Sequence, residues 1–162
     1  MPRKPVIAVI GTGKTDEPAI SHARELGRLI AERGWMMITG GRNAGVMNAA
    51  SEGAKDVEGS LSIGILPDAE TEISDAVDVA IVSGIGEARN NVIVLSADVV
   101  IACGVDDAGT ASEVSLGLKA GKPVILVAAG NAAESFFRGI GGENIHIART
   151  PADAVAIAAR SV

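Results

Sequence analysis

The sequence predicts a single-domain, doubly wound α/β fold with a mainly parallel sheet of about six to seven strands. Two observations support this fold class. Short, almost continuously apolar runs alternate along the chain with longer segments of helical period. The chain has 162 residues, of which 48% are apolar and 21% charged, a balance typical of one globular domain. We therefore expect residues 1–162 to form one domain.

Six apolar runs are expected to form strands. Because each run is apolar at almost every position rather than at alternate positions, we expect the strands to be buried on both faces of the sheet. The intervening helices supply the cover on the two sides. A last strand is expected around His146. The six runs comprise residues 6–10, 35–38, 61–66, 77–82, 99–102 and 124–127.

The segments between the strands carry helix signals. The first helix has apolar or small residues at helical spacing, at positions 20, 23, 27 and 30. Asp16 is expected to cap its start, and Gly34 is expected to end it. Later helices are expected after residues 43–45 and over residues 86–97, 110–120 and 151–160, with a short helix around residues 134–138.

The composition argues against nucleic acid and membranes as partners. The formal net charge is −6, so the chain has no basic footprint for nucleic acid. Its aromatic residues are Trp35, Phe136 and Phe137, too few for a platform on which bases stack. The apolar runs are too short for a membrane span or a signal segment, and we expect a cytoplasmic protein.

Cysteine and histidine are too sparse to predict a metal site. Cys103 is the single cysteine, and His22 and His146 lie far apart in the sequence, so no metal bound by protein ligands alone is expected. Cys103 follows a predicted strand, with no histidine near it in sequence. This position favours a small core residue over a catalytic nucleophile.

A first glycine loop follows the first predicted strand and reads Gly11-Thr12-Gly13-Lys14-Thr15. It is similar to the end of a Walker A loop, but Ala8 stands where the first glycine of that motif belongs. It also departs from the dinucleotide-binding pattern, because Asp16 replaces the third glycine. Two interpretations stay open: a turn that permits close packing, or a loop in which Gly11 and Thr12 contact a ligand.

A second glycine loop, Gly40-Gly41-Arg42-Asn43-Ala44-Gly45, leads from the second strand into a helix. The backbone N–H groups and the positive dipole end at such a helix start favour an anion. Arg42 could add a charge-assisted contact to a phosphate. The candidate binding residues are Gly40, Gly41, Arg42, Asn43 and Gly45. The alternative is a tight turn in which the glycines serve packing alone.

A third loop runs from Cys103 to Glu113 and contains Gly109 and Thr110, both candidates for ligand contact. Taken by itself, the pattern Thr110-x-x-Glu113 favours a capping box, in which each side chain satisfies a backbone N–H at the start of the fourth helix.

Together with three further motifs, these loops resemble the lonely-guy superfamily, whose older members carry a lysine decarboxylase label. The further motifs are Gly-Ile-Leu-Pro at residues 64–67, the Arg89-Asn90 pair and Lys122-Pro123. The resemblance extends from Ile7 to Val127, and the motifs occur in the same order. The short chain and the Arg89-Asn90 pair are most similar to the branch that contains the molybdenum-cofactor carrier proteins.

The resemblance implies a Rossmann-like fold, a homodimer or homotetramer, and a phosphate held by the second glycine loop and the third loop. It also implies a hydrolysis of N-glycosidic bonds in nucleoside monophosphates, with Arg89 and Glu113 at the catalytic positions. A carboxylate suits that reaction, because the sugar becomes positively charged as the bond breaks. We expect Arg89 and Glu113, each near a helix start, to meet at one cleft, form an ion pair and so lower the pKa of the carboxylate.

This sequence departs from the enzymes of the superfamily in its third loop. The enzymes have Pro-Gly-Gly-x-Gly-Thr where residues 103–110 are one position longer and include Asp106 and Asp107. Two carboxylates oppose an anion by Coulomb repulsion unless they point outward or bind a cation. Asn90 also replaces a lysine beside the arginine. The departures make phosphate binding by this loop less secure than by the second one.

Two functions follow as hypotheses. The first is a binding or carrier protein for a phosphorylated pterin- or nucleotide-like ligand, either the molybdenum cofactor or a nucleoside monophosphate. The second is a nucleoside 5′-monophosphate phosphoribohydrolase. Lysine decarboxylation is set aside, because no lysine lies where a pyridoxal-phosphate Schiff base would need it. We also expect a homo-oligomer, since mean hydropathy is +0.33 and residues 92–95 are consecutively apolar on the third helix.

Overall fold

The computed structural model describes residues 3–14 and 17–162. Thr15 of the first glycine loop and Asp16, the expected cap of the first helix, lie outside the described residues. The described residues form one seven-stranded sheet in which every recorded pairing is parallel, with the order β4-β3-β2-β1-β5-β6-β7. This arrangement confirms the doubly wound α/β fold. The strands are β1 (Val6–Ile10), β2 (Met36–Thr39), β3 (Leu61–Leu66), β4 (Val79–Val82), β5 (Val99–Cys103), β6 (Val124–Val127) and β7 (Ile145–Ala148).

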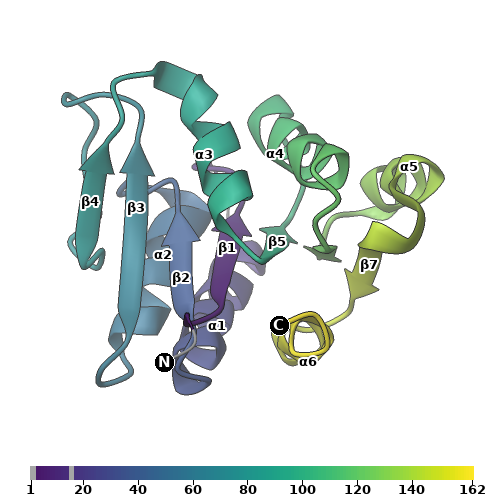
Figure 1. Cartoon of the computed structure of the whole chain (residues 1–162), viewed down its shortest axis with the longest axis horizontal. Helices are drawn as coiled ribbons and strands as arrows, with labels where there is room; N and C mark the ends of the chain where they lie inside the picture. Colours follow the sequence, from purple (N-terminus) through teal and green to yellow (C-terminus); the bar gives the residue numbers. More distant parts are fainter. Residues whose placement is uncertain (1–2, 15–16) are drawn as a thin grey trace.

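Helices cover both faces of the sheet (Figure 1). One layer contains α1 (Ala19–Glu32), α2 (Gly45–Lys55) and α6 (Pro151–Ala158), and the other contains α3 (Arg89–Ser96), α4 (Ala108–Lys119) and α5 (Asn131–Gly141). Short 3₁₀ turns at Gly86–Ala88 and Gly142–Asn144 precede α3 and β7. Among the described helices, none has the length and apolarity needed to cross a bilayer.

Strand β1 shows why a continuously apolar run was the correct signal for a central strand. Ile7 and Val9 pack into the core beneath α1 and α2, whereas Ala8 and Ile10 pack into the core beneath α3 and α4. The helices α1 and α2 approach each other very closely. A Cβ atom on Gly27 would lie 1.9 Å from the carbonyl oxygen of Ala50, so this contact requires glycine.

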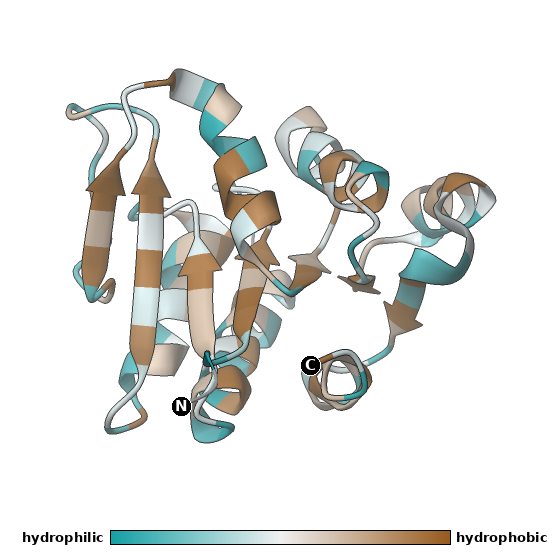
Figure 2. Ribbon diagram, in the orientation of Figure 1, coloured by the Kyte–Doolittle hydropathy of each residue, from teal (hydrophilic) through white to brown (hydrophobic). Residues whose placement is uncertain are grey.

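The expectation of burial on both faces was wrong for residues 77–82. The strand that forms there, β4, is the last strand on its side of the sheet and pairs with β3 alone. All its residues are exposed, and Figure 2 shows its largely hydrophobic ribbon at the edge of the sheet. An apolar run specifies a strand, but the position of that strand in the sheet depends on segments far away in the sequence.

The expected capping box at Thr110 was also wrong. Helix α4 begins at Ala108, and its N-cap is Asp107, whose carboxylate accepts a hydrogen bond from the backbone N–H of Thr110 at 2.7 Å. Glu113 therefore lies in the second turn of α4 rather than the first. The carboxylate of Asp107 supplies the local helix-start bond that the box would have provided, so Glu113 does not cap this helix.

Candidate functional site

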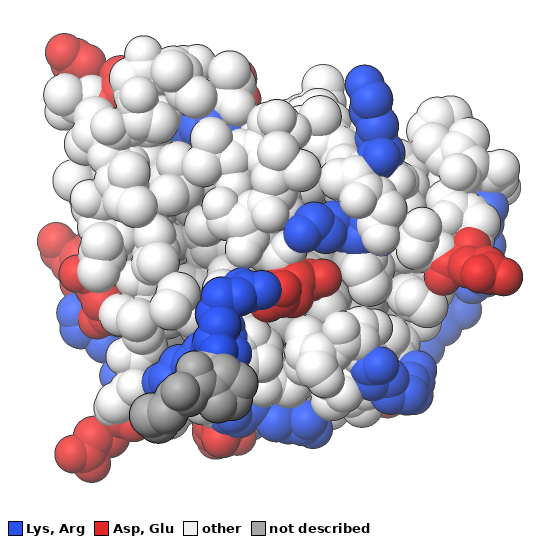
Figure 3. Space-filling view, viewed as in Figure 1, with Lys and Arg blue, Asp and Glu red and all other residues white. Residues whose placement is uncertain are grey.

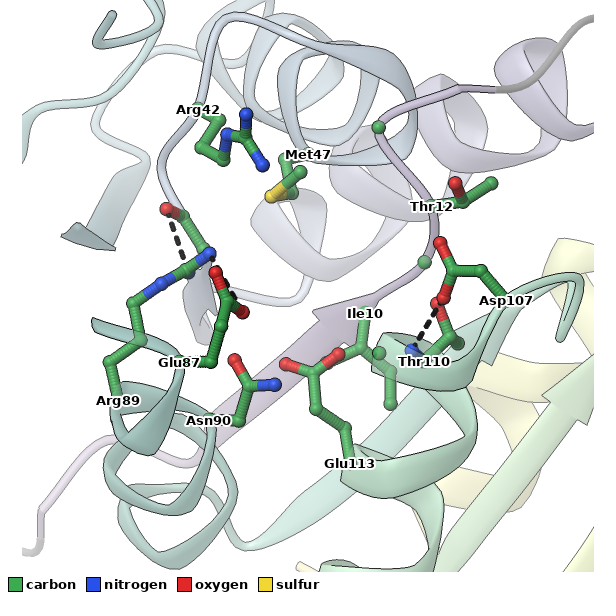
Figure 4. Close-up of a pocket in the computed structure, with 14 residues that line it drawn as sticks. Ile10, Thr12, Arg42, Met47, Glu87, Arg89, Asn90, Asp107, Thr110 and Glu113 are labelled. Atoms are coloured by element: carbon green, nitrogen blue, oxygen red, sulfur yellow. Dashed lines mark hydrogen bonds and ion pairs between the residues drawn. The ribbon is translucent and has the colours of Figure 1, made fainter. Parts of the chain in front are cut away.

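The site lies at the carboxyl ends of β1 and β5, where the strand order reverses. The chain proceeds outward from β1 to β4 and then returns to place β5 on the other side of β1. In open parallel sheets, this reversal leaves a crevice between the two diverging loops. Here the crevice encloses a cavity of ≈ 90 Å³. Its lining, shown in Figure 4, comprises Ile10, Gly11, Thr12, Gly13, Gly40, Arg42, Met47, Glu87, Arg89, Asn90, Asp107, Gly109, Thr110 and Glu113.

The structure brings most of the predicted site residues together in this cavity. Those that line it are Gly11, Thr12, Gly40, Arg42, Arg89, Gly109, Thr110 and Glu113. The lining residues that were not predicted as site residues are Ile10, Gly13, Met47, Glu87, Asn90 and Asp107. Met47 follows the second glycine loop by less than one helical turn, and Glu87 lies two residues before Arg89, so sequence proximity to a predicted site residue was the available signal for both.

Three predicted residues of the second glycine loop lie outside the cavity lining. Gly41 has φ +71°, and a Cβ atom there would lie 2.7 Å from the Cα of Gly64. A Cβ atom on Gly45, which has φ +48°, would lie 2.2 Å from the carbonyl oxygen of Thr12. The side chain of Asn43 donates a hydrogen bond to Glu72 at 2.8 Å. The two glycines therefore permit close backbone packing that shapes the loop around Arg42.

Arg89 is buried with 4% of its surface exposed. Its Nη1 donates hydrogen bonds to the carbonyl oxygens of Ile65 at 2.9 Å and Gly40 at 3.2 Å. Its Nη2 lies 3.9 Å from the carboxylate of Glu87, and its Nε has no partner among the described residues. Burial lowers the pKa of Arg89, although the nearby carboxylates oppose that change. A Cβ atom on Gly40 would lie 2.5 Å from Arg89 Nη1, so glycine at this position leaves room for the guanidinium.

Glu113 is a buried carboxyl group with 8% of its surface exposed. Burial raises its pKa to about 8, with further increases from the negative charges of Asp107 and Glu87; Arg89 offsets only part of the rise. The expected ion pair and lowered pKa were therefore wrong. Within residues 3–14 and 17–162, no ion pair joins Arg89 and Glu113, because the guanidinium is directed to the loop after β2 (Figure 4).

The two aspartates of the third loop have different environments. Burial acts to raise the pKa of Asp107, but its hydrogen bonds, chiefly from Thr110, hold that pKa below its usual value. Asp106 lines a second, larger hollow of ≈ 570 Å³ that opens beside the first cavity. We call this hollow the outer basin; its lining comprises Thr12, Gly13, Lys14, Arg42, Ala44, Asp106 and Asp107. Arg42 is exposed and lines both spaces.

Cys103 is a core residue at the end of β5. Its Sγ donates to the carbonyl oxygen of Ala19 at 3.4 Å, and burial together with Asp106 raises the pKa of the thiol to about 12. A thiol in this state is not a nucleophile near neutral pH.

The fold and the crevice define a Rossmann-like member of the superfamily that the loops resemble. The chain belongs to the SLOG cluster4 family, whose model matches residues 4–155. It is 43% identical over 118 residues to an uncharacterized protein of Archaeoglobus fulgidus, a match that covers 73% of this chain and 76% of that protein.

Two solved structures have nearly the same fold over their whole length. The molybdenum cofactor binding protein of the phototrophic bacterium Rippkaea orientalis is 49% identical with a TM-score of 0.93, and the match covers 98% of this chain and 97% of that chain. The molybdenum cofactor carrier protein of Chlamydomonas reinhardtii is 47% identical with a TM-score of 0.90, covering 97% and 98%.

Proposed function

We propose that this protein binds and carries the molybdenum cofactor, a phosphorylated pterin. The observation that supports this most strongly is the full-length similarity, at 47–49% identity, to a binding protein and a carrier protein for that cofactor. The crevice at the strand reversal has the location expected of a ligand site in this fold. The outer basin beside it gives room for a ligand larger than the inner cavity alone would hold.

The loop between β2 and α2 is the proposed phosphate site. Helix α2 has no side-chain cap at its start, whereas the start of α4 is already capped by Asp107. The positive end of the α2 dipole is therefore the better position for an anion. The guanidinium of Arg42, at the junction of the cavity and the outer basin, can add a charge-assisted hydrogen bond to the phosphate.

Co-elution with the molybdenum cofactor tests the proposal. Cofactor released from a molybdoenzyme under anaerobic conditions is mixed with the protein and passed through a desalting column, and molybdenum and pterin are measured in the protein fraction. Both should co-elute with the wild type. Arg42→Ala should weaken binding about ten- to a hundredfold, because one charge-assisted contact contributes about 1.5–3 kcal/mol.

Arg149→Ala is the matched control for Arg42→Ala. The side chain of Arg149 is 78% exposed and does not line the cavity or the outer basin, so its removal should leave binding unchanged. Absence of cofactor from the wild-type fraction would contradict the proposed function. Equal binding by the wild type and Arg42→Ala would place the phosphate elsewhere.

Phosphoribohydrolysis is the second candidate, because Arg89 and Glu113 line the same cavity. The raised pKa of Glu113 disfavours it, since a neutral carboxyl cannot stabilise the positive charge that develops on the sugar. Incubation with a panel of nucleoside 5′-monophosphates, followed by chromatography of the free bases, distinguishes the two functions. Turnover of about 1 s⁻¹ or more that Glu113→Gln abolishes would favour the hydrolase.

We also propose that the protein is a homodimer or homotetramer. On the third helix, Ile93 and Val94 are buried, whereas Val92 and Leu95 are exposed. Strand β4 exposes further apolar residues at the sheet edge, and Figure 3 shows a largely uncharged surface over β3 and α3. Exposed large apolar side chains of this kind are typical of surfaces that contact a partner. The exposed apolar residues of β4, the turn after it and α3 are Val79, Ile81, Val82, Ile85, Val92 and Leu95.

Sedimentation velocity at micromolar concentration tests the oligomer. We expect a dimer or tetramer that Leu95→Glu dissociates, because the substitution would bury a charge in the contact. Val162→Glu, which changes an exposed apolar residue outside β4 and α3, is the control and should leave the assembly intact. A single species at the monomer mass of 16.3 kDa would contradict the proposal.

A further inference from the structure

The inner cavity contains more acidic than basic side chains. Glu87, Asp107 and Glu113 line it together with Arg42 and Arg89. If every one of these groups were ionised, the cavity would be negatively charged and would repel a phosphorylated ligand. Asp107 is held as a carboxylate by its capping bond, and Glu87 is mostly exposed to solvent. A proton on Glu113 would therefore remove the excess negative charge of the cavity.

The surroundings of Glu113 favour that proton. From α3, the guanidinium of Arg89 is engaged by two backbone carbonyls and Glu87 rather than by Glu113. Figure 4 shows the carboxyl of Glu113 directed between the α3 and α4 ribbons, beside the uncharged side chains of Asn90 and Ile10. The acidic groups around it are Glu87, from the turn before α3, and Asp107, from the start of α4. A buried carboxylate in this position would have like charges nearby and no paired cation among the described residues.

We propose that Glu113 is a neutral carboxylic acid that donates its proton in a hydrogen bond to the ligand, so that the anionic ligand is captured together with a proton. This inference rests on the proposed binding function and adds a ligand-contacting role for Glu113. A carboxylic acid offers one O–H donor, whereas a carboxylate only accepts. Deprotonation therefore removes a donor and adds a repulsive charge at the same time.

The inference predicts binding that weakens in alkaline solution. Because burial raises the pKa of Glu113 to about 8, most of the protein holds the proton at pH 7 and little does at pH 9.5. Since only the protonated form is competent, affinity should fall about thirtyfold over this interval and about tenfold for each pH unit well above the pKa.

The protonation state can be measured without any ligand. Carbon-13 NMR of the glutamate carboxyl groups, with the Glu113 signal assigned by its absence from Glu113→Gln, should give a midpoint near pH 8. A midpoint near the ordinary value of 4.5 would overturn the inference. This result is independent of the proposed function, because it does not involve the molybdenum cofactor.

Binding of the molybdenum cofactor between pH 7 and 9.5 tests the role in capture. The wild type should lose affinity about thirtyfold, and Glu113→Gln, which cannot ionise, should vary by less than about threefold whatever its affinity at pH 7. Glu58→Gln, at an exposed position outside the cavity, is the control and should keep the wild-type pH dependence. Wild-type affinity that is independent of pH would overturn the capture of a proton. Failure of the cofactor to bind at every pH would instead contradict the proposed function, and the capture step with it.

Discussion

Replacing Glu113 with glutamine should change how the stability of the protein depends on pH. Burial raises the pKa of Glu113 from 4.5 to about 8, so the folded protein holds this proton more tightly than the unfolded chain does. The stabilising contribution of the protonated group is complete below pH 4.5 and is lost as the pH rises through about 8. Glutamine has nearly the same shape and does not ionise.

The size of the effect follows from the two pKa values. They differ by about 3.5, and each pKa unit corresponds to about 1.4 kcal/mol. Raising the pH from 4.5 to 9 therefore lowers the free energy of unfolding by at most about 5 kcal/mol through this group, because the unfolded chain ionises before the folded protein does. The difference in unfolding free energy between Glu113→Gln and the wild type should grow in favour of the variant over this range.

Urea unfolding followed by circular dichroism at several pH values measures this difference. The lowered pKa values of Asp98 and Asp107 make the folded state more stable as the pH rises. Both proteins contain these residues, so their contributions cancel in the comparison. Glu58→Gln serves as the control and should follow the wild type. Parallel stability profiles for Glu113→Gln and the wild type from pH 6 to pH 9 would refute the reasoning.

Three further predictions concern the fold. Asp107→Ala should lower the free energy of unfolding, measured in urea, by about 1 kcal/mol, and Thr150→Ala at the N-cap of α6 should lower it equally. An unchanged free energy of unfolding in Asp107→Ala would argue against the observed cap. The thiol of Cys103, with its pKa raised to about 12, should resist iodoacetamide at pH 8 in the folded protein and react in urea; rapid labelling of the folded form would contradict its burial. Gly27→Ala should destabilise by about 1–3 kcal/mol because its Cβ would meet the α2 backbone, whereas Gly139→Ala has open space and should not; similar stabilities would contradict the close helix contact.

The positions of the helices and strands were largely readable from local patterns. The continuously apolar runs at β1, β5 and β6 predicted central parallel strands, because burial on two faces leaves no position for a polar residue. The helix around residues 134–138 was predicted too short: α5 spans Asn131–Gly141, with its apolar face around the buried Phe137. The signals for its ends were obscured by glycine, alanine and asparagine.

The site was predictable as a set of loops but not as a set of contacts. Parallel strands place their carboxyl ends at one edge of the sheet, which is why glycine loops separated in the sequence were expected to meet. Loop composition could not show which residues face inward. Arg42 lines the cavity. Its neighbour Gly41 packs against the backbone of Gly64, and its neighbour Asn43 donates a hydrogen bond to Glu72.

The sequence by itself determined the doubly wound α/β fold and the convergence of the three loops, since both follow from patterns within short segments. The tertiary structure decided that β4 is an exposed edge, because edge position depends on which strands pair with it. It also decided the state of Glu113. Asp107, rather than Glu113, caps the start of α4. Arg89, the cation expected to pair with Glu113, instead donates hydrogen bonds to the carbonyl oxygens of Gly40 and Ile65. The charge of a buried carboxyl depends on its partners in space, and those partners come from segments that only folding brings together.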